Sequence, residues 1–174
     1  MVTTLSPGKK APHIVDVVIE ITPEQGPVKY EICKDAGALR VDRIISTAMH
    51  YPGLYGYIPS TLCDDGDPCD VLILCHEKIL PGTIMAARPV GMLVMEDEAG
   101  LDNKIIAVPD ASVSKSYEHI QDLSDISQAI QDKIAHFFAH YKDLDKNKWV
   151  KVSGWENAKS AKAEIEKSIS AVSE

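Results

Sequence analysis

The sequence predicts a single α+β domain over residues 1–174, mainly β, with strands first and helices last. Two patterns support this prediction. Apolar and polar residues alternate through much of the first two-thirds of the chain, and apolar residues recur every three or four positions through the last third. Because 45% of the residues are hydrophobic and no repeat or linker divides the chain, we expect one packed core.

Strand patterns begin near the amino terminus. Residues 14–21 alternate apolar with polar side chains, and residues 28–33 do so again, with Lys29 and Glu31 projecting side by side. In the next run Arg43 shares a face with two apolar side chains, which indicates an anionic partner nearby. The later strand-like runs cover residues 39–45, 71–75, 83–95 with an interruption at Pro89, and 104–108.

Two helices are expected in the last third of the chain. The first has Asp125 and Gln128 in its amino-terminal turn, and the second follows Gly154. Their apolar stripes are Ile126, Ile130, Ile134, Phe137 and Tyr141 in the first helix, and Ala158, Ala161, Ile165 and Ile169 in the second.

The net charge of −8 disfavours nucleic acid as a partner, because the field of the molecule repels a phosphate backbone. No run approaches the roughly 18 apolar residues of a membrane span, and the amino terminus lacks the apolar segment of a secretory signal. We therefore expect a soluble, cytoplasmic protein with no membrane partner.

The cysteines lie at positions 33, 63, 69 and 75 and form no Cys-x-x-Cys pair. This spacing argues against a zinc–thiolate site and against a redox dithiol. They are interpreted as reduced thiols that act as small core residues in strands.

The segment Asp64-Asp65-Gly66-Asp67-Pro68-Cys69-Asp70 is the strongest local signal for chemistry. It could be a solvated turn, since Asp-Gly and Asp-Pro are common turn dipeptides. However, four carboxylates within seven residues repel one another unless a hard cation gathers them, and Pro68 stiffens the segment. A cation site is therefore the stronger interpretation.

Other metal and nucleotide motifs do not fit. An EF-hand loop that starts at Asp65 would need an acidic residue where His76 stands and glycine where Asp70 stands. His136 and His140 have metal-like spacing but lack the glutamate of a metalloprotease, so we expect an outward-facing surface or interface pair. Neither a P-loop nor a Rossmann fingerprint occurs, which argues against a kinase or a dehydrogenase.

Several separate motifs closely resemble the soluble inorganic pyrophosphatases of bacteria, of the family I type. The resemblance runs from about Ile14 to the last helix. It departs from the family at Cys69, where an aliphatic residue is usual. The motifs are Tyr-Glu-Ile at 30–32, Gly-Ala-Leu-Arg-Val-Asp-Arg at 37–43, Tyr-Pro-Gly-Leu-Tyr-Gly-Tyr at 51–57, Asp-Gly-Asp-Pro-Cys-Asp at 65–70, Asp-Glu-Ala-Gly-Leu-Asp at 97–102 and His-Tyr-Lys-Asp-Leu at 140–144.

The resemblance implies an OB-like closed five-stranded β-barrel with additional strands and two helices, assembled as a homohexamer of two trimers. It also implies hydrolysis of inorganic pyrophosphate to two orthophosphates. A metal-activated water attacks in line, without a covalent intermediate, and Mg²⁺ serves as the cofactor, with Mn²⁺ as a possible substitute.

The same resemblance assigns roles to site residues. Asp67 corresponds to the general base. The metal ligands are Glu20, Asp65, Asp70, Asp97 and Asp102, and Asp70 is placed to bridge two ions. The substrate-binding residues are Lys29, Glu31, Arg43, Tyr55, Lys104, Tyr141 and Lys142.

The summed formal charge of these site residues indicates why the site needs metal ions. Its seven carboxylates and four cationic side chains sum to −3, so the pocket should repel pyrophosphate, which is itself a polyanion. Two divalent cations would reverse the sign to +1, and all-oxygen ligands favour Mg²⁺ or Mn²⁺.

Two alternatives stay open. One is an OB-type binding module, although aromatic residues make up only 6% of the chain and the expected cleft is negative, which disfavours nucleic-acid binding. The other is a metal-dependent phosphatase for organic phosphates, which a comparison of pyrophosphate with nucleotides would separate.

Overall fold

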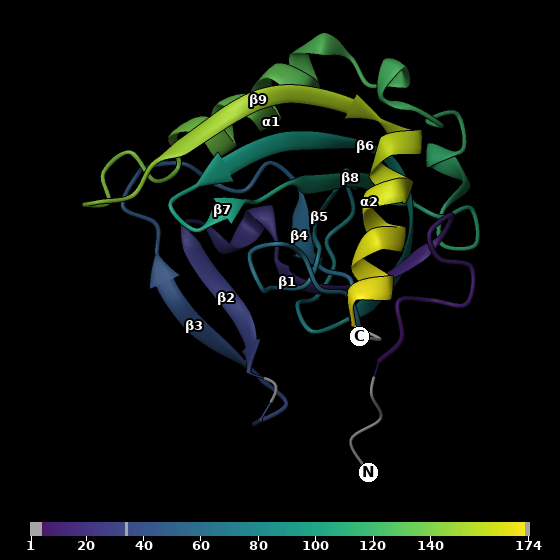
Figure 1. Ribbon diagram of the computed structural model, residues 1–174, viewed down its shortest axis with the longest axis horizontal. Helices are drawn as coiled ribbons and strands as arrows, with labels where there is room; N and C mark the ends of the chain where they lie inside the picture. Colours follow the sequence, from purple (N-terminus) through teal and green to yellow (C-terminus); the bar gives the residue numbers. More distant parts are fainter. Residues whose placement is uncertain (1–4, 34, 173–174) are drawn as a thin grey trace.

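Five strands pair in a ring at the centre of the computed structural model, which describes residues 5–33 and 35–172 (Figure 1). β1 (Val15–Ile21) pairs antiparallel with β4 (Leu54–Tyr57), and β4 pairs antiparallel with β5 (Asp70–Ile73). β5 runs parallel to β8 (Lys104–Pro109), and β8 is antiparallel to β6 (Ile84–Asp97), which returns to β1. The predicted α+β class with a mainly β content is confirmed.

The remaining strands extend or flank this ring. β7 (Gly100–Leu101) and β9 (Val150–Asn157) both pair with β6. β2 (Val28–Cys33) and β3 (Ala38–Ile44) pair with each other as a separate hairpin, which stands apart from the ring in Figure 1. This hairpin carries part of the site described below.

Two helices cover the strands. α1 (Gln128–His140) packs against β9, and α2 (Ala158–Ala171) runs along β6 (Figure 1). Short 3₁₀ helices are η1 (Pro23–Gln25), η2 (Lys115–Tyr117) and η3 (Leu123–Asp125). Apolar side chains form one cluster with α1 and another with α2, so β8 is buried along its whole length.

The strand predictions need several corrections. Pro89 does not interrupt β6. Proline has no backbone N–H to donate, and the register of β6 against β8 shifts between Pro89 and Gly91, so the strand continues without that hydrogen bond. β5 ends at Ile73 rather than at residue 75. β4, β7 and β9 were not predicted, and Gly154, which was expected to precede a helix, lies inside β9 with φ +145°.

Both helices are confirmed, but their starts differ from the prediction. α1 begins at Gln128 after Ser127, because Asp125 belongs to η3, where its carboxylate accepts from the backbone N–H groups of Gln121 and Asp122. Ile130 is exposed and leaves the predicted stripe. α2 begins after Asn157, whose side chain caps the helix by accepting from Ser160 N.

The cysteine interpretation is wrong in part. All four are free thiols, but only Cys33 lies in a strand and only Cys69 is buried. The histidine prediction is confirmed, since His136 and His140 are both exposed and their ring centroids lie 4.6 Å apart. Within residues 5–33 and 35–172, no helix is long and apolar enough to cross a membrane.

Candidate active site

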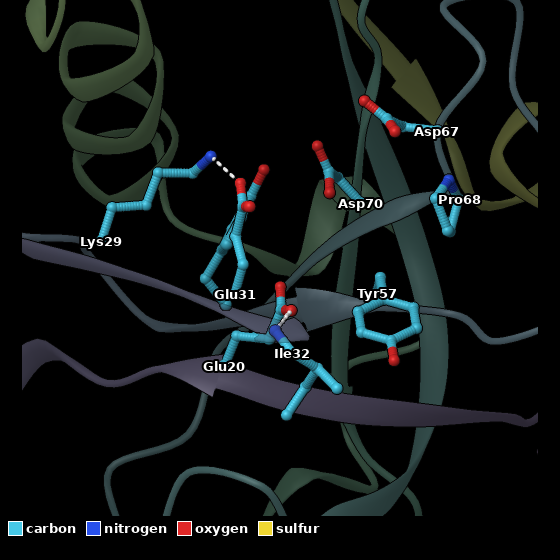
Figure 2. A pocket seen from close by; sticks show the side chains of 9 residues that line it. Glu20, Lys29, Glu31, Ile32, Tyr57, Asp67, Pro68 and Asp70 are labelled. Atoms are coloured by element: carbon cyan, nitrogen blue, oxygen red, sulfur yellow. Dashed lines mark hydrogen bonds and ion pairs between the residues drawn. The ribbon is translucent and has the colours of Figure 1, made fainter. Parts of the chain in front are cut away.

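A pocket of about 280 Å³ lies between the β2–β3 hairpin and the ring (Figure 2). Six of the predicted site residues line it, from β1, β2, β4, β5 and the acidic loop 64–70. These six predicted residues are Glu20, Lys29, Glu31, Tyr55, Asp67 and Asp70, and the lining also includes Ile32, Tyr57 and Pro68. The other predicted residues are not part of this lining. They are Arg43 on β3, Asp65 in the acidic loop, Asp97 at the end of β6, Asp102 before β8, Lys104 at the start of β8, and Tyr141 and Lys142 after α1.

On the hairpin side, Lys29 lies between two carboxylates, and we call Lys29, Glu31 and Asp42 the hairpin triad. Its Nζ is 2.6 Å from Glu31 Oε1 and 3.1 Å from Asp42 Oδ2. Burial lowers the pKa of Lys29, but Glu31 and Asp42 outweigh it and hold the pKa above its ordinary value. The predicted side-by-side placement of Lys29 and Glu31 is confirmed.

Glu20 projects from β1 toward the carboxylates of the pocket (Figure 2). Its Oε1 accepts a hydrogen bond of 2.6 Å from Ile32 N. Burial, with smaller contributions from the charges of Asp70 and Glu31, raises the pKa of Glu20 to about 7. Glu20 is therefore close to the balance between its neutral and charged forms at neutral pH.

On the ring side, a second lysine lies between two carboxylates, and we call Asp70, Lys104 and Asp102 the buried triad. The parallel register of β5 and β8 places Asp70 opposite Lys104. Lys104 Nζ lies 2.6 Å from Asp70 Oδ2 and also pairs with Asp102 Oδ1. Burial lowers the pKa of Lys104, but the two carboxylates outweigh it and hold the pKa above its ordinary value.

Asp97 and Lys142 form a third charged pair. Asp97 ends β6, Lys142 follows α1, and their charged atoms are 2.7 Å apart with both side chains nearly buried. Burial alone would raise the pKa of Asp97, but Lys142 outweighs it and holds the pKa below its ordinary value. Glu98, which the sequence reasoning did not assign to the site, lies 3.8 Å from Lys142.

Three tyrosines pack together beside the buried triad. The ring centroid of Tyr51 is 4.8 Å from that of Tyr55 and 6.4 Å from that of Tyr141. Burial raises the pKa of Tyr51 and of Tyr55 well above the ordinary value, so both phenols stay protonated donors. Tyr51 was missed in the sequence assignment, although it opens the same motif as Tyr55.

The acidic loop folds back on itself at Gly66, whose φ of +90° suits glycine. Asp67 N donates to Asp65 Oδ1 over 3.0 Å, and Asp67 itself is exposed. Burial raises the pKa of Asp65, helped by the charges of Asp102, Asp67 and Asp70. The loop thus places Asp65 within electrostatic range of the buried triad.

The anionic partner expected for Arg43 is not found at its Nε within residues 5–33 and 35–172. This nitrogen is buried and has no hydrogen-bond partner within the part of the chain that the structure describes. Since its Cα lies opposite that of Lys29, this donor stands at the hairpin edge of the pocket. An unpaired buried guanidinium nitrogen is a ready donor for an anion.

The donor chemistry of the site fits hard divalent cations. Carboxylate oxygens dominate it, and burial together with neighbouring carboxylates raises the pKa values of Asp65 and Asp102. Among the described residues, no three His, Cys, Asp or Glu side chains already surround one point as a metal site. The carboxylates of Asp70 and Asp102 do converge on one cation, the ammonium of Lys104.

The chain is similar to known proteins over nearly all of its length. The family model for inorganic pyrophosphatase matches residues 17–173. The inorganic pyrophosphatase of Escherichia coli (strain K12) is 56% identical over 158 residues, which cover 91% of this chain and 90% of that protein. The inorganic pyrophosphatase of Rickettsia conorii is 51% identical and covers 91% and 92%.

Solved structures agree with these relatives. An inorganic phosphatase from Anaplasma phagocytophilum superposes with a TM-score of 0.95 at 46% identity and covers 97% of this chain and 99% of that one. The inorganic pyrophosphatase of Helicobacter pylori superposes with a TM-score of 0.93 at 45% identity, with coverages of 98% and 99%.

Proposed function

This chain belongs to the inorganic pyrophosphatase family and is an inorganic diphosphatase, and we propose that it hydrolyses pyrophosphate in the pocket beneath the β2–β3 hairpin. The resemblance inferred from its motifs is confirmed. The observation that supports this location is the meeting of four carboxylates and one lysine from four separate segments around one pocket. They are Glu20 on β1, Lys29 and Glu31 on β2, Asp67 in the acidic loop and Asp70 on β5.

The cationic side chains of the pocket would bind the two phosphates. Lys29 and Arg43 on the hairpin and Lys142 on the opposite side supply positive charge, and Arg43 Nε is buried without another partner among the described residues. The hydroxyls of Tyr55 and Tyr141 would donate to phosphate oxygens. Glu31 and Lys104 act on the substrate through the lysine and the carboxylates that they pair with.

Asp67 is the proposed general base. It lines the pocket and is exposed, so a water molecule can reach its carboxylate. Asp67 would take a proton from that water as the oxygen attacks one phosphorus in line and the other phosphate departs. Both products are orthophosphate, and no residue forms a covalent bond to phosphorus.

The proposed metal ligands are Glu20, Asp65, Asp70, Asp97 and Asp102, with Mg²⁺ as the cofactor and Mn²⁺ as a possible substitute. When bound, the cations would neutralise phosphate oxygens and lower the pKa of a nearby water. Without them, the formal charge of −3 on the predicted site residues opposes the binding of an anionic substrate.

Three finer statements rest on the family and are proposals here. The ring of five strands is proposed to be an OB-like closed β-barrel, with the paired order β1-β4-β5-β8-β6 as its support. The chain is proposed to form a homohexamer of two trimers and to work in the cytoplasm.

Phosphate release from pyrophosphate, measured with Mg²⁺ and after chelation, tests the function. We expect release with Mg²⁺ only, and far slower release from a nucleoside triphosphate. Equal rates on the nucleotide would instead indicate a phosphatase for organic phosphates, and equal rates after complete chelation would contradict the metal requirement.

The Asp67→Asn variant tests the assignment of the base. We expect turnover to fall by about 10²–10⁴-fold, the usual contribution of a positioned general base. Mg²⁺ affinity, measured by calorimetry without substrate, should stay close to that of the parent protein. Loss of Mg²⁺ binding in a folded variant would show that Asp67 is a ligand instead.

A further inference from the structure

Two cysteines meet at the base of the acidic loop. Cys63 and Cys69 flank residues 64–68, and their Sγ atoms are 3.0 Å apart. The sequence argued against a redox dithiol because the two are not spaced as Cys-x-x-Cys. The reversal of the loop nevertheless brings the two thiols together.

The two thiols differ in their exposure and in the residues that hold them. Cys69 is buried, its N–H donates to Thr61 Oγ1 over 2.9 Å, and its carbonyl accepts from Ile58 N over 2.9 Å. Cys63 is partly exposed, and its Sγ lies 3.4 Å from Ser168 Oγ on α2. An oxidant from solvent therefore reaches Cys63 first, with Cys69 behind it.

We propose that Cys63 and Cys69 form a reversible disulfide when the protein meets hydrogen peroxide, and that this bond displaces the loop that carries Asp65 and Asp67. The first half stands independently of the pyrophosphatase activity. The second half rests on the proposed function, because it assigns a consequence to those two carboxylates.

The chemistry balances with peroxide as the only oxidant. Cys63 sulfur attacks one peroxide oxygen, the O–O bond breaks, and water leaves, so that Cys63 carries a sulfenic acid. Cys69 sulfur then attacks Cys63 sulfur, the S–O bond breaks, and a second water leaves. Two thiols and one peroxide thus give one disulfide and two waters, and a dithiol reductant reverses the result.

Closing the bond moves the loop because the sulfurs must approach from 3.0 Å to about 2.05 Å. Cys69 is hydrogen-bonded to Ile58 and Thr61 outside the loop, whereas the backbone of Cys63 is bonded to Gly66 and Asp67 within it. The movement therefore falls on Cys63 and the loop residues that follow it. Cys63 N donates to Asp67 O over 2.8 Å, which passes the shift to Asp67. Displacements of about 1 Å in a catalytic site can cost about 10²-fold in rate.

Cys75 provides a matched control on the same part of the chain. Its Sγ lies 3.1 Å from Glu77 Oε2, a carboxylate rather than a second sulfur. Like Cys63, it is partly exposed. Peroxide can therefore oxidise Cys75, but the geometry provides no disulfide partner for it there.

The test treats the full chain with hydrogen peroxide and digests it with a protease that cleaves before aspartate, which cuts the loop between Cys63 and Cys69. We expect two peptides that remain joined until a dithiol reductant is added. Activity should fall by about tenfold or more on oxidation and return on reduction.

The Cys63→Ser and Cys69→Ala variants should lose both the joined peptides and the reversible loss of activity, and Cys75→Ser should keep both. Absence of joined peptides from the oxidised parent protein would overturn the disulfide. Joined peptides with unchanged activity would overturn the displacement of the loop. The untreated protein's activity separately tests the proposed function.

Discussion

The buried triad and the hairpin triad have the same composition and different surroundings. In each, one lysine lies between two carboxylates, at 2.6 Å from the nearer oxygen of Asp70 in one and of Glu31 in the other. The Lys104 side chain is 3% exposed, whereas that of Lys29 is 22% exposed and its partner Glu31 is 51% exposed. Ion pairs of the same kind therefore contribute differently to the free energy of unfolding in the two triads.

The difference follows from the strands that carry the two triads. β5 and β8 are neighbours inside the ring with both faces covered, so Lys104 has lost most of its water and depends on Asp70 and Asp102. β2 and β3 form a hairpin beside the ring, and water screens its charges. The ring side of the site, with the buried triad, is therefore preformed, whereas the hairpin side, with the hairpin triad, is adaptable.

The largest effect is expected for Lys104→Met. Removing the ammonium leaves Asp70 and Asp102 with uncompensated charge in a largely buried place, so the free energy of unfolding should fall by about 3–5 kcal/mol. Urea denaturation without Mg²⁺ measures this. A loss below about 1 kcal/mol would mean that the triad behaves like a surface pair.

A pH dependence centred on Glu20 is expected next. Its pKa is about 7 in the folded protein and 4.5 as a free side chain, so between these values the folded state holds a proton that the unfolded state has released. Proton binding by Glu20 therefore stabilises the folded state by up to about 3 kcal/mol. This stabilisation is complete below about pH 4.5 and is lost as the pH rises through about 7.

Urea denaturation of the parent and of Glu20→Gln, with a chelator present, checks this. From about pH 5 to about pH 8, the unfolding free energy of the parent should fall relative to that of Glu20→Gln. A difference that is constant with pH would show that Glu20 is charged throughout.

The Arg43→Met variant distinguishes an effect on substrate binding from an effect on the stability of the protein. Because Arg43 Nε has no partner among the described residues, its loss should change the unfolding free energy by less than about 0.5 kcal/mol. The KM for pyrophosphate should rise by about 10–100-fold, the value of a lost hydrogen bond to a charged group. Arg40→Met, an exposed arginine on the same strand, should leave KM unchanged.

A much smaller loss of stability than for Lys104→Met is expected for Lys29→Met. Water competes for the ion pairs of the hairpin triad, so the unfolding free energy should fall by less than about 1 kcal/mol, and less again at high salt. Urea denaturation at two salt concentrations tests it. A loss that matches Lys104→Met would remove the contrast between the two triads.

Local patterns were sufficient for the elements that have strong patterns of their own. The alternation over residues 14–21 and 28–33 predicted β1 and β2, and the three- and four-residue steps predicted α1 and α2. β4 and β9 were missed because their local patterns are weak. β4 has only four residues, and Gly154 weakens the alternation of β9. Hydrogen bonds to the distant strands β1, β5 and β6 define them instead.

The site shows the same division. The motifs named the acidic loop, Lys29, Glu31 and Arg43 of the hairpin, and Tyr55. Asp42, Tyr51, Glu98 and the contact of Cys63 with Cys69 came from the fold. The acidic loop is short enough for its chemistry to be read from residue types. Contacts made by side chains from different elements have no such local signal.

The sequence by itself determined the family, the α+β class and the residue types of the site, because these depend on local periodicity and on motifs that are contiguous in the chain. Only the tertiary structure decided that Lys104 is buried between two carboxylates and that Glu20 has a pKa of about 7. It also decided that Arg43 has a nitrogen without a partner in the described part of the chain. Burial and charge are set by atoms that lie far apart along the chain.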